Sequence, residues 1–427
     1  LNMGFPDFFK AVGKGKTVNT SIFKGKRVIL DGYNFVFQMA SRLAVSVLLK
    51  NDPGKSCTEF KKLIEPFTRT CSFVFLVFDG QMLPCKSIIS INRQIQQDKF
   101  LEMGLKAYAD SKQQLSPAVK KLLRKGFRFP KPIVEAVIEC LNRTFPHNFL
   151  AFQSPYEADQ QMAHMFHTQQ VDFVLSNDSD MIAYEVDLVR DFCRGKGQLY
   201  DRNTFTGFCA KNRLSKPHQL VKLILGGCDY FPFKSGASFR GQKLVMRGCL
   251  RYKCEARVLQ SLLCSLLNFY HHIVFDFHSA TFEPFHEMGL DQQLLQFCPE
   301  FVIGDLELVG KQFTNKMGPK TMTNFQKYIK MLQNEIVLRE NKSVIQDFGV
   351  EVKGNCVKIL GVEAVIDIQS IYEDFLETQA DKYKAKVSYK KKQWERQEKL
   401  EQELEIVEEV EEKEEKEMEN TEIIGAE

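Results

Sequence analysis

The sequence lacks the features that mark secreted, zinc-finger or membrane proteins. Its 12 cysteines form no CxxC pair, and no Cys/His spacing typical of zinc occurs, so we expect neither a disulfide framework nor a zinc site. No apolar run approaches the roughly 20 residues that cross a bilayer. No apolar h-region occurs near the N-terminus. Tryptophan occurs once, at Trp394. We therefore expect reduced thiols, no membrane partner and no signal peptide.

The charge is distributed unevenly along the 427 residues, whose net charge is +4. Residues 401–427 contain 13 Glu and 2 Lys, a net charge of −11, whereas residues 381–400 carry +5. Residues 1–380 therefore carry +10. A basic body with an acidic tail suggests a polyanionic partner, nucleic acid first. Composition leaves ordinary surface charge open as the alternative.

Short apolar segments alternate with helical patterns over the first 230 residues, which predicts an α/β fold with a parallel sheet between helices. The predicted strands are Arg27–Leu30, Phe73–Phe78, Phe149–Phe152, Asp172–Leu175 and Asp187–Asp191. The predicted helices are Phe35–Leu49, Thr58–Thr70, Ile88–Ala109, Pro117–Lys125, Pro132–Asn142, Pro155–Thr168 and His218–Leu225. Segments such as Val74–Phe78 are apolar at every position, which is typical of buried parallel strands.

The chain outside this alternation falls into three further parts. Residues 81–148 contain no strand pattern and many Lys and Arg, so they are predicted to be a helical insertion. After Asp229 we expect an irregular helical part up to about residue 376. Residues 381–427 are charged and predicted to be a solvated helix or disordered.

Carboxylates follow several of the predicted strands. Asp31 and Asp79 come directly after apolar runs, and Asp178 and Asp180 follow a third. Because ligands bind outside the carboxyl ends of parallel strands, these acids are expected in one cleft. Repelling carboxylates need cations, and hard oxygen ligands select Mg²⁺ or Mn²⁺. The alternative for each acid alone is a turn former or helix N-cap.

Two other acidic segments allow two interpretations each. Ser154 and Glu157 fit an S-x-x-E capping box with Pro155 at the first helical position, in which case Asp159 only favours the helix dipole. The other interpretation makes both acids ligands. Asp229 follows a Gly pair that permits a tight turn, and by itself it is typical of a turn residue.

Taken together, six segments resemble the XPG-type structure-specific 5′ nucleases, with exonuclease 1 as the nearest type. They are Met3-Gly4-Phe5, Ile29-Leu30-Asp31-Gly32-Tyr33, Val77-Phe78-Asp79-Gly80, Ser154-Pro155-Tyr156-Glu157-Ala158-Asp159, Asn177-Asp178-Ser179-Asp180 and Gly226-Gly227-Cys228-Asp229-Tyr230. Their order and approximate spacing match the family, and the resemblance covers roughly residues 3–250. A lone xxDG carries no such information, whereas the ordered set does.

The resemblance implies two Mg²⁺ ions, replaceable by Mn²⁺, that hydrolyse a phosphodiester near a 5′ end. The implied metal site consists of seven carboxylates: Asp31, Asp79, Glu157, Asp159, Asp178, Asp180 and Asp229. Some of them are expected to act through water. Lys86 and Arg93, seven residues apart on one helix face, are implied to grip the scissile phosphate. A solvated basic face is the alternative for this pair.

The resemblance also implies DNA contacts at Gly4, Lys86, Arg93, Gly236 and Ser238. The family's GIG turn reads Gly236-Ala237-Ser238 here, so a K⁺ site at this turn is doubtful. The implied fold is a central, mostly parallel sheet flanked by helices, with a helical arch over residues 81–148. A helix-turn-helix-type DNA-binding element over 218–250 follows. The implied domains are a nuclease core at 3–250, a helical extension at 251–380 and the tail at 381–427.

The function implied is a Mg²⁺-dependent 5′→3′ exonuclease on double-stranded DNA, with flap-cutting activity, in repair or recombination in the nucleus. A dedicated flap or junction endonuclease and a catalytically silent DNA-binding protein remain alternatives. The implied partner is duplex DNA with a 5′ end, nick, gap or flap. Residues 369–376 weakly resemble a sliding-clamp peptide, with a short packed helix as the alternative. Lys390-Lys391-Lys392 reads either as a nuclear signal or as a solvated helix face.

Overall fold

The computed structural model divides into two units, residues 1–368 and 369–427. The structure describes residues 5, 8–49, 54–83, 86–193, 195–228, 230, 262, 265–269, 273–285, 306–333, 351–353, 356–359 and 362–365. The clamp-like segment at 369–376, Lys390–Lys392 and the acidic tail lie outside these residues. All of the described residues belong to the first unit.

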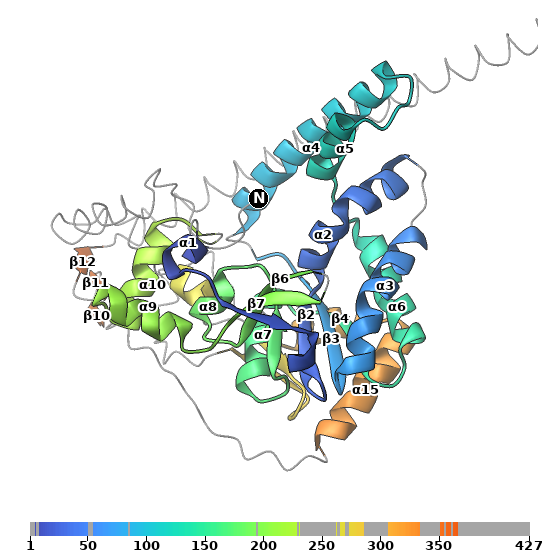
Figure 1. The fold of residues 1–427 in the computed structure, drawn as a ribbon. Helices are drawn as coiled ribbons and strands as arrows, with labels where there is room; N and C mark the ends of the chain where they lie inside the picture. Colours follow the sequence, from blue (N-terminus) through green and yellow to red (C-terminus); the bar gives the residue numbers. More distant parts are fainter. Residues whose placement is uncertain are drawn as a thin grey trace, which may run out of the picture. The chain divides into compact units, whose positions relative to one another are not determined.

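A seven-stranded sheet forms the centre of this unit, in the order β1-β7-β6-β5-β2-β3-β4 (Figure 1). The strands are β1 (Lys16–Asn19), β2 (Arg27–Asp31), β3 (Phe73–Phe78), β4 (Phe149–Gln153), β5 (Phe173–Leu175), β6 (Leu188–Cys193) and β7 (Lys196–Tyr200). Strands β6, β5, β2, β3 and β4 are parallel, whereas β7 and β1 add antiparallel at one side. The predicted α/β class with a mostly parallel sheet is confirmed.

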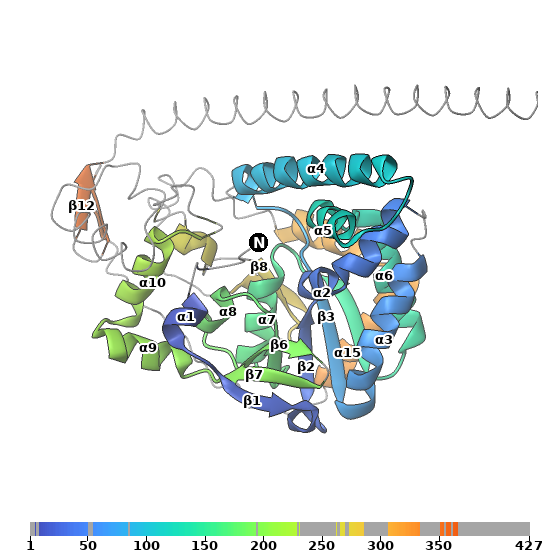
Figure 2. The ribbon, with the colours of Figure 1, turned by 45° about the horizontal axis from the view of Figure 1, so that its top comes forward.

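Helices pack on both faces of the sheet. The first part of the chain contains α1 (Phe8–Val12), the 3-10 helix η1 (Thr20–Phe23), α2 (Gly32–Ala44), the π-helix η2 (Val45–Leu49), α3 (Gly54–Thr70), α4 (Ser87–Asp110), α5 (Pro117–Gly126) and α6 (Lys131–Thr144). The later part contains α7 (Ala158–His167), α8 (Asp180–Ala183), α9 (Thr204–Asn212), α10 (Lys216–Leu225), α14 (Leu306–Asn315) and α15 (Pro319–Gln333). The predicted helical insertion at 81–148 corresponds to α4, α5 and α6, of which α4 and α5 lie side by side (Figure 2).

The side chains of the central strands alternate between the two faces of the sheet and pack against the helices on each. Val74, Leu76 and Phe78 belong to the core cluster formed with α2, α3 and α6. On the other face, the Tyr328 ring of α15 lies 4.6 Å from the rings of both Phe73 and Phe75. Each such ring removes roughly 150–250 Å² from water, so this aromatic packing attaches α15 firmly to the sheet.

The edge of β4 is closed by a side chain. The Asn142 amide of α6 donates to the Ala151 carbonyl at 2.8 Å and accepts from the Ala151 N–H at 2.9 Å. Asn142 also donates to Thr321 of α15, and Glu139 of α6 accepts from the Lys320 and Thr321 N–H groups at the start of α15. Hydrogen bonds therefore connect two segments that are about 180 residues apart in the sequence.

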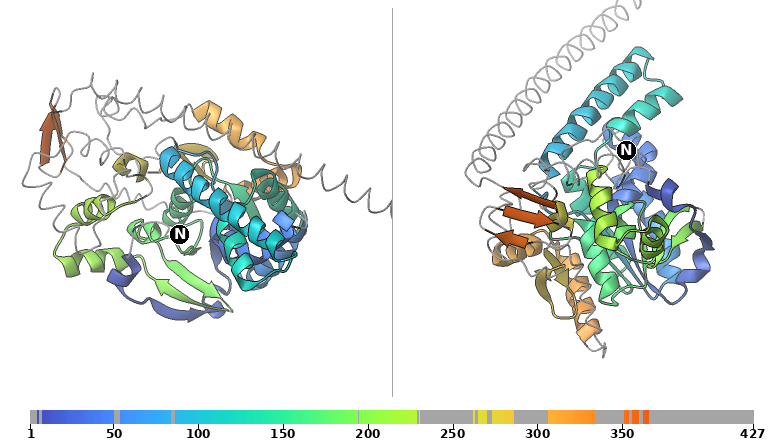
Figure 3. Two further views of the ribbon diagram at one scale, coloured as in Figure 1. Left: turned by 90° about the horizontal axis from the view of Figure 1, so that it is seen from above. Right: turned by 90° about the vertical axis from the view of Figure 1, so that its left-hand side faces the viewer.

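The part expected to be helical after residue 250 also contains strands, which the sequence pattern did not predict. The hairpin of β8 (Ile273–Asp276) and β9 (Thr281–Pro284) packs against α7. A separate sheet of β10 (Glu351–Lys353), β11 (Cys356–Ile359) and β12 (Val362–Val365) is antiparallel throughout (Figure 3). Among the described helices, none is long and apolar enough to cross a membrane.

Candidate active site

The strand-end acids lie along one edge of the sheet. Asp31 is the last residue of β2 and pairs in register with Val77 of β3, so Asp79 follows just beyond it. Leu175 ends β5 beside Leu30, and Asp178 comes three residues later. Because β5, β2 and β3 are parallel neighbours, their carboxyl ends meet at the same edge. The predicted placement of these acids is observed, while their role as ligands stays a prediction.

Ser176 joins two of the acids, a link that the motifs did not indicate. Its hydroxyl donates to Asp31 Oδ2 at 2.7 Å and accepts from the Asp178 N–H at 3.0 Å. Asp178 Oδ1 in turn accepts the Asp180 N–H, the first of α8, at 3.0 Å. The three carboxylates are all buried. This chain of contacts fixes them relative to each other without neutralising any of them.

The start of α7 brings Glu157 and Asp159 to this edge, beside β4. Glu157 is the N-cap residue, but its side chain makes no capping hydrogen bond. Ser154 instead donates to the carbonyls of Phe78 and Tyr156. The capping-box interpretation is therefore wrong, because Asp79 Oδ1 accepts the Ala158 N–H at 2.9 Å and takes over the cap.

Gly80 lets the loop before α7 lie against the end of β3. Its N–H donates to the Tyr156 carbonyl at 2.6 Å. A Cβ at this position would lie 1.8 Å from the Ser154 carbonyl oxygen, a distance that no side chain tolerates. The Gly in the Asp79-Gly80 pair is thus required by the close approach of two backbone segments, which also sets Asp79 beneath the helix.

Burial and repulsion raise the pKa values of two acids. Burial is the main cause that raises the pKa of Asp31 to about 6, the Asp178 charge adds to it, and hydrogen bonds from Asn34 and Ser176 oppose it. Burial likewise raises the pKa of Asp159 well above its usual value, helped by the charges of Asp178 and Asp31. The edge is therefore a site that a positive charge would stabilise.

One cation of the chain already reaches the edge. Lys86 Nζ lies 2.6 Å from Glu157 Oε2 and 4.6 Å from the centre of the Tyr230 ring. Its charge lowers the pKa of Asp159, against the effect of burial. Lys86 is the N-cap residue of α4, and Arg93 comes seven residues later on that helix, roughly 10 Å along its axis, where it is partly buried. The contact of Lys86 supports its predicted position, and the role of both residues stays a prediction.

A buried glutamine connects this edge to the segment after α10. The Gln160 amide donates to the hydroxyls of Tyr184 at 2.6 Å and Tyr230 at 2.9 Å. Burial, and then the charges of Glu157, Asp159 and Asp180, raise the pKa of Tyr230 well above its usual value. Tyr230 therefore lies among the acids. Gln160 was missed because a glutamine inside a helix has no motif of its own.

Four predicted site residues lie outside the described residues: Asp229, Gly4, Gly236 and Ser238. The predicted DNA-binding helices over 218–250 are described only as far as α10 and residue 230. The K⁺ site at Gly236-Ala237-Ser238 is likewise untested.

The donors of the edge are oxygen atoms of carboxylates, which fit Mg²⁺ or Mn²⁺ by their chemistry. The raised pKa values of Asp31 and Asp159 fit this further, because bound cations would relieve the repulsion. Among the described residues, the compact group of metal-ligand atoms lies elsewhere, at His164, Asp276 and Glu283.

The family model XPG I-region matches residues 148–229, which include β4, the start of α7 and the acids after β5. The acidic sheet edge of this α/β fold thus matches the XPG I-region model, and the resemblance to XPG-type nucleases is confirmed. It is 25% identical over 233 residues to exonuclease 1 of Xenopus laevis, covering 50% of this chain and 29% of that protein. It is 25% identical over 245 residues to exodeoxyribonuclease 1 of Schizosaccharomyces pombe, covering 56% and 40%.

The chain therefore spans well under half the length of these curated relatives. Among solved structures, it is similar to the catalytic core of Rad2 in complex with DNA substrate, with 16% identity, a TM-score of 0.41 and coverage of 74% of this chain and 86% of that one. A second is the Holliday junction-resolving enzyme GEN1 with product DNA and Mg²⁺, with 15% identity, a TM-score of 0.34 and coverage of 77% and 73%.

Proposed function

We propose that the chain is a divalent-metal-dependent 5′ nuclease acting on DNA, and more finely a 5′→3′ exonuclease on duplex DNA that also cuts 5′ flaps. The observation that carries the proposal is the set of buried carboxylates at neighbouring strand ends, with raised pKa values for Asp31 and Asp159. The XPG I-region and the exonuclease relatives support the same reaction class.

In this proposal the acids of the edge hold the metal ions. The Asp178 charge raises the pKa values of Asp31 and Asp159, and the Asp31 charge adds to that of Asp159, so these three acids are the inner candidates. Asp79 accepts a backbone N–H of α7 and is expected to contribute partly through water. Two Mg²⁺ ions, or Mn²⁺ in their place, would supply Lewis-acid charge and lower the pKa of an attacking water.

Lys86 and Arg93 are proposed to bind the scissile phosphate. Lys86 pairs with Glu157 in the absence of DNA, and a phosphate would compete for its ammonium group. Arg93 lies on α4, which Lys86 precedes as the N-cap residue, and can add a second cation to the same phosphate. Helices α4 and α5 are proposed to form the arch that selects free 5′ ends.

The test compares two substrates with the full chain. A 5′-labelled blunt duplex and a 5′-flap duplex are digested side by side with Mg²⁺ and with Mn²⁺. Release of labelled mononucleotides from the blunt duplex, together with flap cutting, is expected. Addition of EDTA should stop both reactions, and excess Mg²⁺ should restore them, which excludes a metal-independent contaminant.

The alternatives give different products. A single flap-sized product with an intact blunt duplex would identify a dedicated flap endonuclease. Binding of either DNA without cleavage under both metals would refute the nuclease and indicate a silent DNA-binding protein. A nuclear location and the sliding clamp as a partner stay predictions.

A further inference from the structure

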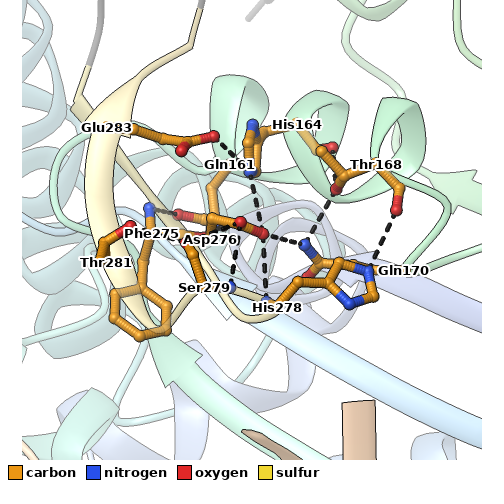
Figure 4. A network of polar contacts seen from close by, with 10 residues as sticks. All are labelled: Gln161, His164, Thr168, Gln170, Phe275, Asp276, His278, Ser279, Thr281 and Glu283. Atoms are coloured by element: carbon orange, nitrogen blue, oxygen red, sulfur yellow. Dashed lines mark hydrogen bonds and ion pairs between the residues drawn. The ribbon is translucent and has the colours of Figure 1, made fainter. Parts of the chain in front are cut away.

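A second polar cluster lies where α7 meets the β8–β9 hairpin, away from the sheet edge (Figure 4). His164 Nε2 of α7 lies 3.7 Å from Asp276 Oδ1 of β8 and 3.6 Å from Glu283 Oε1 of β9. All three ligand atoms lie within 4.8 Å of one another. His164 comes five residues after Asp159, so it sits roughly 8 Å further along the helix axis.

These separations are too long for hydrogen bonds, which end near 3.2 Å for N–H···O. His164 Nε2 is buried and has no hydrogen-bond partner, although its ring is only 5% exposed. Ligand atoms about 2.1 Å from a tetrahedral ion lie roughly 3.4 Å apart, which is close to the observed spacing. The buried imidazole is thus within ion-pair distance of two carboxylates, and the same dimensions fit three ligands around one ion.

The surrounding hydrogen bonds hold one ligand in place. Asp276 Oδ1 accepts from Gln170 at 2.8 Å and from the His278 N–H at 3.2 Å, and Oδ2 accepts from the Ser279 hydroxyl at 2.8 Å. Because both oxygens only accept hydrogen bonds, they belong to an ionised carboxylate. Such outer contacts are what orient ligands at metal sites.

The hairpin and the helix are also joined independently of any ion. Gln161, three residues before His164, accepts the Phe275 N–H and donates to the Phe275 carbonyl, both at 2.8 Å. This pairing fixes the distance between α7 and β8. Glu283 completes the cluster from the solvent side, since 38% of its side chain is exposed while that of Asp276 is fully buried. An ion could therefore enter past Glu283.

We propose that His164, Asp276 and Glu283 bind one divalent transition-metal ion, Zn²⁺ by preference, which fastens the β8–β9 hairpin to α7. An imidazole among the ligands selects Zn²⁺ over Mg²⁺, which takes oxygen ligands. The role is structural: the ion holds the second half of the helix whose first turn carries Asp159. The site is independent of the proposed nuclease reaction.

The test measures Zn²⁺ binding to the full chain in excess Mg²⁺, which keeps the oxygen-only edge occupied. Elemental analysis after dialysis is expected to find one Zn²⁺ bound at the cluster. His164→Gln and Glu283→Gln should each lower the affinity for this ion at least tenfold. The matched control is His278→Gln, a histidine of the same hairpin outside the cluster, which should stay within twofold. Zn²⁺ bound by cysteine thiols is the same in the parent chain and the three variants, so it does not affect the comparison.

Glu283 lies at the rim of the cluster, so Glu283→Gln still tests Zn²⁺ binding if the buried substitution His164→Gln prevents folding. A second readout is amide hydrogen exchange of residues 273–284, which Zn²⁺ should slow in the parent chain and not in Glu283→Gln. Equal Zn²⁺ affinity of the parent chain and Glu283→Gln would overturn the site. Zinc binding that leaves amide exchange of the hairpin unchanged would show that the ion does not hold the hairpin to α7.

Discussion

Helix α7 carries two kinds of polar side chain near its start, and their surroundings are opposite. Glu157 and Asp159 join acids from neighbouring strands, and burial and like charges raise the pKa of Asp159. Two residues after Asp159, Gln161 meets complementary backbone groups of β8, with both hydrogen bonds at 2.8 Å. The acids repel one another, whereas Gln161 pairs with its neighbours.

The difference separates groups that stabilise the fold from groups that the fold merely tolerates. Paired amides such as Gln161 contribute to stability in the chain as it stands. Crowded acids such as Asp31 cost stability unless a cation binds, and strain of this kind concentrates at functional sites. Substitutions at the acidic edge and at Gln161 should therefore have opposite consequences for stability and cleavage.

The largest effect is expected at the acidic edge. Asp178→Ala should lower cleavage by at least a thousandfold, roughly 4 kcal/mol, because a ligand of the proposed ions is lost. DNA affinity should stay close to that of the parent chain, since the basic surface is unchanged. Single-turnover cleavage and a binding titration measure the two quantities.

Asp172→Ala is the matched control for Asp178→Ala. Asp172 precedes β5 at its opposite end, where it contacts Lys26 and the Arg27 N–H. Its loss should leave the cleavage rate of folded protein within a few-fold. If Asp178→Ala keeps more than about a tenth of the activity, two-metal chemistry at this edge is wrong.

The next effect concerns the cations of α4. Lys86→Met or Arg93→Met should lower the single-turnover rate by roughly a hundredfold with little change in DNA affinity, because both are proposed to act on the reacting phosphate. Lys99→Met, at an exposed position of the same helix, is the control. Loss of affinity alone, with a flatter salt dependence, would make Lys86 and Arg93 ordinary phosphate contacts.

A stability effect is expected from Asp31→Asn in the metal-free chain. The pKa of Asp31 rises from 3.8 to about 6 on folding, so its contribution to stability is present below pH 4 and is lost as the pH rises through 6. The substitution removes this loss, roughly 3 kcal/mol at pH 7.5. Urea unfolding with EDTA at pH 4.5 and pH 7.5 measures it.

The control for this variant is Asp110→Asn, at an exposed position at the end of α4. Asp31→Asn should also abolish cleavage, so stability and activity change in opposite directions. An unfolding free energy at pH 7.5 equal to or below that of the parent chain would show that Asp31 is not destabilised by its surroundings.

The smallest effect is expected at Gln161. Gln161→Leu leaves the Phe275 N–H and carbonyl without their partner and should cost about 2 kcal/mol of unfolding free energy. Cleavage by the folded protein should remain within twofold. Gln96→Leu, at an exposed position of α4, should change neither quantity. A thousandfold loss of cleavage in Gln161→Leu would contradict the distinction between Gln161 and the acidic edge.

The sequence predicts the parallel core well because its strands are continuous apolar runs. Phe73–Phe78 was predicted with the bounds that the structure has. Strands β1 and β7 were missed because they are polar, pair antiparallel and lie at one side of the sheet, with exposed residues such as Lys16 and Lys196. Residues 273–284 were assigned to a helical part, since two four-residue strands are too short for periodicity to distinguish.

The candidate site was predictable only where a strand precedes each acid. Asp31, Asp79 and Asp178 follow apolar strands, and the sheet brings them together. Ser154 could not be assigned from spacing, because Asp79, 79 residues before Ala158, takes over the helix cap. The cluster of His164, Asp276 and Glu283 was not foreseen, since its ligands come from elements more than 100 residues apart.

The amide of Asn142 has a consequence for how this chain behaves among its own copies. An outer strand with open N–H and carbonyl groups invites a strand of another molecule to add to it. At Ala151 both groups are already taken by Asn142, which α15 holds in turn through Thr321. Growth of the sheet beyond β4 is therefore blocked at its middle. Asn142 lies only nine residues before Ala151, so the α6–β4 segment carries this protection itself, and Thr321, 179 residues after Asn142, adds a hydrogen bond that holds the amide in place.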